Sequence, residues 1–128
     1  MPVTTQGEPD QWGSQDGSLT AAISDAMAKL MHEHAGRGPT ESRTTLGKDL
    51  VVCVMSHALT KIEQTLVSHG KREAVLDTRR AVQETMRVDA IRAVHELTGR
   101  RVDAFLSANH IDPDLAVEIF VLGPLADV

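Results

Sequence analysis

The sequence has few of the residues that bring covalent or redox chemistry to a protein. Among its 128 residues Cys53 is the only cysteine, so neither an internal disulfide nor a zinc site made of several cysteines can form within the chain. The only aromatic residues are Trp12, Phe105 and Phe120, too few for a surface that stacks nucleic-acid bases. The net charge of −5 also argues against nucleic acid as a partner, because such binders need a basic face.

Long apolar runs are missing as well. The first residues, MPVTTQGEPDQWGSQDGS, have neither the basic start nor the apolar run of a secretory signal. No stretch approaches the ~18 consecutive apolar residues of a membrane span. We therefore expect a cytoplasmic protein without direct membrane insertion.

Length and composition indicate one domain preceded by a tail. Residues 1–17 are rich in Gly, Pro, Gln, Asp and Ser and, after the initial methionine, contain only Val3 and Trp12 as sizeable apolar residues. Such a segment cannot bury enough surface to offset the entropy lost on ordering. We expect a disordered N-terminal tail at 1–17 and a single α+β domain at 18–128.

The pattern from Ser18 onward predicts a helix and then a β-hairpin. Apolar residues recur at steps of three and four, which is typical of an amphipathic helix: Leu19, Ala22, Ile23, Ala26, Met27, Leu30 and Met31. Ser18 is the expected N-cap, and Gly36 with Pro39 ends the helix. The threonine-rich run 40–46, the turn 47–49 and the β-branched run 50–55 predict two antiparallel strands, the first at an edge or half exposed.

The second half predicts two helices and another hairpin. Thr60 and Glu63 have the spacing of a capping box, which starts a short helix that ends near Gly70. A long helix follows from about Lys71 to Leu97, with one stripe at steps of three and four: Val75, Arg79, Val82, Met86, Ala90, Ala93 and Leu97. Residues 101–108 and 115–122 predict strands, the first with Val102, Ala104 and Leu106 on one face and the second with Val117, Ile119 and Val121 on one face. The order α-ββ-αα-ββ implies a four-stranded antiparallel sheet with helices packed on one face.

The length of the long helix predicts an oligomer. About 27 helical residues span roughly 40 Å, whereas an eight-residue strand spans about 27 Å. The helix therefore extends beyond its own sheet, although its apolar stripe continues to both ends. Because a second copy in a two-fold dimer commonly covers such a surplus, we expect a homodimer through the long helix.

Several segments in order resemble one bacterial family. They are GRGPT (36–40), ALTKIEQTL (58–66), RRAVQE (79–84), ELTGRRVDAFLS (96–107) and DPDLAVEIFVL (112–122). Together they are similar to the MpsC family, formerly a YbcI-like domain of unknown function, over about residues 18–122. The resemblance implies a component of a sodium-translocating, membrane-potential-generating system, hence membrane transport proteins as partners. It carries no catalytic residues to this chain.

Three arginines are the candidate ligand-binding residues. Arg37 follows a helix C-terminus, where backbone amides do not bind phosphate, but its guanidinium can hold an anion together with Arg43. The alternative for both is a salt bridge or plain solvation. Arg79 lies on the apolar stripe of the long helix and needs a partner, for which Glu63 or a residue of a second subunit is suited.

Other polar clusters favour structural explanations. His32 and His34 point away from each other on a helix, so they cannot share a metal there. Cys53 with His57 lacks an acidic orienting residue and is not expected to be a nucleophile. Asp112 and Asp114, beside His110, are also standard turn residues. We predict no catalytic residues, no metal site and no cofactor.

These observations favour a non-enzymatic accessory or regulatory protein that acts by homo- and hetero-protein interaction. The alternative is a small-molecule or anion sensor in which Arg37, Arg43 and Arg79 line a common cleft.

Overall fold

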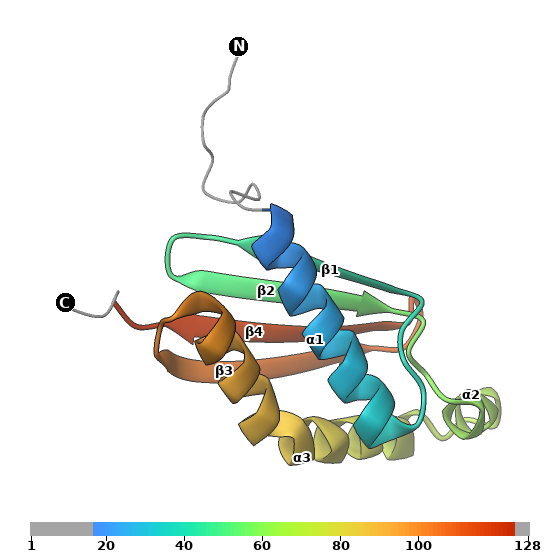
Figure 1. Ribbon diagram of the computed structural model, residues 1–128. Coiled ribbons are helices and arrows are strands. Elements are labelled where there is room, and N and C mark those ends of the chain that lie inside the picture. The colour runs from blue at the N-terminus through green and yellow to red at the C-terminus, as the bar shows by residue number, and fades with distance from the viewer. Residues whose placement is uncertain (1–16, 125–128) are drawn as a thin grey trace, which may run out of the picture.

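The computed structural model describes residues 17–124, which form three helices and four strands (Figure 1). In chain order they are α1 (Gly17–Ala35), β1 (Glu41–Leu46), β2 (Leu50–Ser56), α2 (Lys61–Ser68), α3 (Arg72–Thr98), β3 (Val102–His110) and β4 (Leu115–Leu122). The predicted α+β class and element order are confirmed. The expected tail lies outside the described residues except for Gly17, where α1 begins one residue before the predicted N-cap Ser18.

The four strands form one antiparallel sheet in the order β1-β2-β4-β3. Both predicted hairpins form, and pairing of β2 with β4 joins them in the middle of the sheet. β1 is an edge strand, as its polar composition predicted. β3 extends two residues beyond its predicted end, because Asn109 pairs with Ala116 and His110 with Leu115.

A β-bulge in β3 changes the side on which its first residue lies. The register shifts between Val102 and Ala104, so Val102 packs against the core while Ala104 and Leu106 do not share that side. The simple alternation predicted for 101–108 placed all three on one face and was wrong at Val102. An extra residue on one strand of a pair inverts the alternation at that point.

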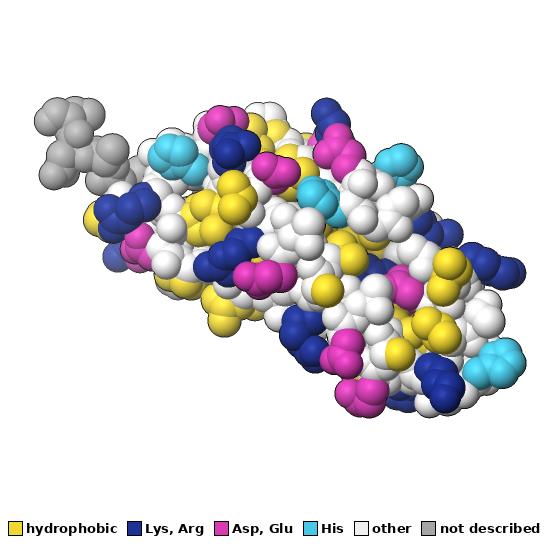
Figure 2. All heavy atoms as spheres, turned by 90° about the horizontal axis from the view of Figure 1, so that it is seen from below, with side chains coloured by type: hydrophobic (Ala, Val, Ile, Leu, Met, Phe, Trp, Pro, Cys, Tyr) yellow, Lys and Arg dark blue, Asp and Glu magenta, His cyan; other side chains and the backbone are white. Residues whose placement is uncertain are grey.

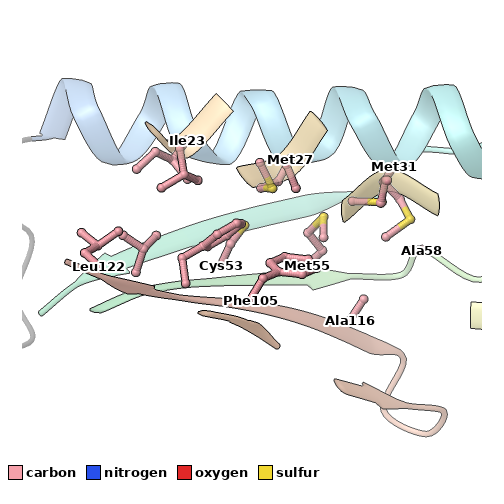
Figure 3. Close-up of a cluster of buried hydrophobic side chains, with 14 residues drawn as sticks. Ile23, Met27, Met31, Cys53, Met55, Ala58, Phe105, Ala116 and Leu122 are labelled. Carbon is pink, nitrogen blue, oxygen red and sulfur yellow. The ribbon is translucent and has the colours of Figure 1, made fainter. Parts of the chain in front are cut away.

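Both long helices cover the same face of the sheet (Figure 1). α1 contacts β1 and β2, α3 contacts β3, and the two helices contact each other. Figure 3 shows Ile23, Met27 and Met31 of α1 directed toward Cys53 and Met55 of the sheet. Met86, Ala90 and Val94 of α3 complete this core with Phe105, Phe120 and Leu122.

The ends of the helices follow from local residues. Gly36 and Gly99 have φ of 81° and 71°, a left-handed conformation that suits glycine after a helix. The capping box predicted for α2 is present: the Glu63 amide donates to Thr60 Oγ1 at 3.2 Å, and the Thr60 amide donates to Glu63 Oε1 at 2.9 Å. Thr60 thus starts α2 by pairing amides that have no partner within the helix.

α3 is continuous over 27 residues but bends near its middle (Figure 1). The Thr85 hydroxyl donates to the Ala81 carbonyl at 2.9 Å, a contact that often accompanies bending. The first turns of α3 cover a second apolar cluster of Leu59, Val75 and Ile111, against which Leu66 and Val67 of α2 pack. The N-terminal end of the apolar stripe is therefore covered within the chain, whereas Leu97 at the other end is 39% exposed, and the homodimer through this helix stays a prediction.

Candidate functional site

The most buried acidic group of the described residues is Glu118, at the middle of β4 on the side that faces the helices. Its side chain is 0% exposed. Ser107 Oγ donates to Glu118 Oε1 at 2.5 Å, and Gln83 Nε2 donates to Oε2 at 2.9 Å. Burial raises the pKa of Glu118 to about 7, against the opposing effects of these two hydrogen bonds and the positive charge of Arg79. The carboxyl group therefore keeps its proton to a higher pH than an exposed glutamate does.

A pocket of about 320 Å³ lies beside this carboxyl group, between α3 and β3. Its walls are Leu76, Arg80, Gln83, Glu84, Arg87, Phe105, Ser107, Ala108 and Asn109. The side-chain amides of Gln83 and Asn109 exchange two hydrogen bonds, of 3.1 and 2.8 Å.

The two arginines of the pocket also have partners in the chain. Arg80 pairs with Asp77 at 2.7 Å. Arg87 lies over the Phe105 ring, 5.6 Å from its centroid, and donates to the Phe105 carbonyl at 3.4 Å. Each of the amide and guanidinium groups that line the pocket thus has a partner within the chain.

Arg79 has the partner predicted for it. Its Nη2 lies 3.1 Å from Glu63 Oε1, with the two side chains 4% and 8% exposed. Its Nη1 contacts Met31 Sδ at 3.6 Å. Both charges are therefore compensated inside one chain, and no residue of a second subunit is needed.

The other two candidate arginines lie elsewhere. Arg37 Nη2 donates to the His57 carbonyl at 3.0 Å. Arg43 is exposed on β1, with its Nε 3.7 Å from Glu41 Oε2. Arg37, Arg43 and Arg79 share none of these partners, so the structure does not bring them together as the sensor hypothesis requires. Ligand binding by each of them stays a prediction.

The histidines and the cysteine occupy separate places. His34 Nε2 lies 3.7 Å from Asp89 of α3, while His32 lies against Gly38. Cys53 is buried, and this burial raises the pKa of its thiol. Within residues 17–124 no three His, Cys, Asp or Glu side chains gather as a metal site would require.

The loop after β3 is held by its own polar groups. Asp114 Oδ2 accepts a hydrogen bond from the Leu59 amide at 2.9 Å, and His110 Nδ1 lies 2.8 Å from the Pro113 carbonyl. Asp114 thus connects this loop to the start of α2, which is a structural role of a turn residue.

The other face of the sheet carries a continuous apolar surface. Cross-strand pairing places Val52, Ile119 and Leu106 in one row. Together with the rows on either side they form what we call the aliphatic block: Leu50, Val52 and Val54 of β2, Val117, Ile119 and Val121 of β4, and Ala104, Leu106 and Ala108 of β3. Their strand neighbours, among them Val51, Cys53 and Phe120, point into the core, so the block points away from it.

None of the described helices covers the aliphatic block. α1 and α3 lie on the opposite face, and α2 contacts α3. Leu106 is 52% exposed. In an antiparallel sheet with one solvated face, polar residues are expected to alternate with apolar ones. The central strands β2 and β4 are instead apolar on both faces apart from Glu118 and Ser56, which is the pattern of strands covered on both sides.

Figure 2 shows the molecule from below the view of Figure 1, and this surface carries many charged side chains. Acidic and basic side chains alternate over it, and neither sign dominates. Such a mosaic is typical of a solvated surface and does not form the basic patch that nucleic acids require. None of the helices in the described part of the chain is both long and apolar enough to cross a membrane.

Sequence reasoning missed both Glu118 and the aliphatic block. The alternation in 115–122 placed Val117, Ile119 and Val121 on one face, which is confirmed. Strict alternation also puts Glu118 on the other face with Phe120 and Leu122, which are buried in the core. The available signal was that both faces of this strand are apolar, which indicates a covered strand and a carboxyl group in its interior.

Comparison with known proteins gives one match. The chain matches the family model described as Na⁺-translocating membrane potential-generating system (MpsC) over residues 15–123. No curated protein and no solved structure matches it.

Proposed function

This chain belongs to the MpsC family of the Na⁺-translocating membrane potential-generating system, and we propose that it is a non-enzymatic accessory or regulatory component of such a system. It acts in the cytoplasm by contact with other proteins, including copies of itself and membrane transport proteins. The observation that carries the proposal is the aliphatic block, because contiguous apolar surfaces of this kind mark sites of protein association.

The arrangement of polar groups supports a role without catalysis. A nucleophile needs a base within hydrogen-bond reach and a third group that orients the base. Cys53 lies in the core with its thiol pKa raised, and its side-chain neighbour is the Ser42 hydroxyl at 3.4 Å. Glu118 is held by Ser107 and Gln83. Cys53 and Glu118 are thus each held by other side chains of the core, which supports a structural role for both.

The sensor alternative has weaker support. It requires several arginines that converge on one cleft, whereas Arg37, Arg43 and Arg79 each contact a different partner. The pocket between α3 and β3 contains Arg80 and Arg87, but both are engaged within the chain.

The test measures the membrane potential of cells that lack this protein. We expect deletion to lower the Na⁺-dependent part of the potential, read with a potential-sensitive dye, and the wild-type chain to restore it. Ile119→Asp, which puts a charge at the centre of the aliphatic block, should fail to restore it. Thr45→Asp is the matched control, because Thr45 lies in the same cross-strand row but on the polar strand β1.

A deletion strain that keeps its full Na⁺-dependent potential would overturn the proposal. Equal restoration by Ile119→Asp and Thr45→Asp would show that the aliphatic block does not carry the function.

A further inference from the structure

The aliphatic block has a centre, and that centre is Ile119. In its own row Ile119 pairs with Val52 of β2 and Leu106 of β3. Along β4, Val117 and Val121 lie on the same side of the strand as Ile119. The block therefore extends about equally in all directions from this residue and contains no charged side chain.

The polar residues of this face lie to one side of the block. On β1, Glu41, Arg43 and Thr45 pair with Ser56, Val54 and Val52 and share the outward direction of the block. The fourth strand thus forms a polar margin, while the other three are aliphatic.

The composition of the block limits what can cover it. A charged or highly polar partner would gain no hydrogen bond or ion pair from nine aliphatic side chains. The first 16 residues of the chain offer Met1, Val3 and Trp12 as large apolar groups, too few to replace water over this area. A second flat aliphatic sheet face matches it in both shape and chemistry, and another copy of the chain supplies one.

We propose that the aliphatic block packs against the same block of a second copy, in a two-fold dimer whose axis passes beside Ile119. An axis parallel to the strands places β4 over the partner subunit's β4 and β2 over its β3. The polar strand β1 of each copy then lies at the rim. Face-to-face packing at about 10 Å is the ordinary geometry of two antiparallel sheets. This inference rests on the proposed function in using the same face, and it names the partner.

The size of the face agrees with a dimer that dissociates on dilution. The three strands that overlap in this arrangement, spaced about 4.8 Å apart and about seven residues long, cover about 14 Å by about 23 Å. Two such faces bury about 650 Å² before the relief of the side chains is counted, which is below the ~1,000 Å² of stable specific interfaces and favours a weak dimer. We therefore expect monomer and dimer to exchange over an accessible concentration range.

α3 offers a less continuous surface than the sheet. Its large exposed apolar residues are Val88, 63% exposed, and Leu97, 39% exposed, which lie nine residues apart on the helix. The sheet face, rather than the long helix, is therefore the interface that we assign.

Sedimentation equilibrium of the full chain over a concentration series tests the inference. We expect the wild type to approach the dimer mass as concentration rises, and Ile119→Asp to stay monomeric. Val88→Asp is the matched control and should dimerise like the wild type. Circular dichroism checks that each variant folds, and Leu106→Asp, at an exposed position of the same block, replaces Ile119→Asp if the latter does not fold.

A wild-type chain that is monomeric throughout overturns the inference, and so does a dimer that Val88→Asp abolishes while Ile119→Asp does not. The proposed function is judged separately. If deletion lowers the Na⁺-dependent potential while the purified chain is monomeric, the accessory role stands and the block binds a different protein.

Discussion

Glu118 brings an ionisable group into the middle of the helix-covered face. Its carboxyl oxygens accept hydrogen bonds from Ser107 and Gln83, and these bonds limit the cost of burial. Desolvation remains the largest effect on its pKa, which rises from 4.5 to about 7. The folded protein therefore holds this proton over a pH range in which the unfolded chain has released it.

Stability should accordingly depend on pH through Glu118. Because the unfolded chain binds fewer protons between about pH 4.5 and 7, the free energy of unfolding falls as pH rises through that range and levels off above it. We expect Glu118→Gln to remove a decline of about 3 kcal/mol. Chemical denaturation at pH 5 and pH 8 measures it, with Glu84→Gln, an exposed residue beside the same pocket, as the control. Parallel pH profiles for the wild type and Glu118→Gln would contradict this expectation.

A second prediction for individual residues concerns the buried pair of Arg79 and Glu63. Arg79→Met leaves the Glu63 carboxylate buried without its partner, which should lower the free energy of unfolding by about 3 kcal/mol. Combining it with Glu63→Gln removes the unpaired charge and should recover part of that loss. A double-mutant cycle measured by urea denaturation gives the coupling. Strictly additive losses would mean that the two side chains do not stabilise each other.

Among the elements, α2 begins with a capping box at Thr60, the residue before its first turn. It has eight residues, too few for a stable isolated helix, and Thr60 closes its capping box. We expect Thr60→Ala to lower the free energy of unfolding by about 1 kcal/mol. Thr65→Ala, at an exposed position of the same helix whose hydroxyl bonds only to the Lys61 carbonyl, should change it by less than about 0.5 kcal/mol. Equal effects at Thr60 and Thr65 would argue against the cap as the cause.

A feature of the fold could be predicted from the sequence when its signal lies in neighbouring residues or in one conspicuous charge. Caps act within a few residues, so the capping box at Thr60 and the helix end at Gly36 could be predicted from neighbouring residues alone. The pairing of Arg79 with Glu63 was also accessible, because a charge in an apolar stripe needs a partner. The bulge at Val102 left no such signal, since its extra residue belongs to an otherwise regular alternation.

The network around Glu118 was out of reach for a different reason. It joins Gln83 of α3, Ser107 and Asn109 of β3, and Glu118 of β4, which meet only after α3 has packed on the sheet. The cover over the first turns of α3 was out of reach for the same reason. Leu59 and Ile111, which lie outside that helix in the sequence, pack on Val75, so this end of the apolar stripe is buried within the chain.

For the whole molecule, the boundary of the domain can be tested by truncation. The family match begins at residue 15, and the preceding segment is mostly polar. We expect a chain that begins at Gln15 to keep the free energy of unfolding of the full chain within about 0.5 kcal/mol. A larger loss would show that Trp12 or its neighbours contribute to the folded domain.

The single thiol of the chain lies beneath α1, where Ser42 contacts it. A maleimide dye can react with this thiol only while α1 is separated from the strands, so the labelling rate at Cys53 reports the frequency of that local opening. The native protein thus contains its own reporter, and no engineered cysteine is needed to time how often its interior is exposed.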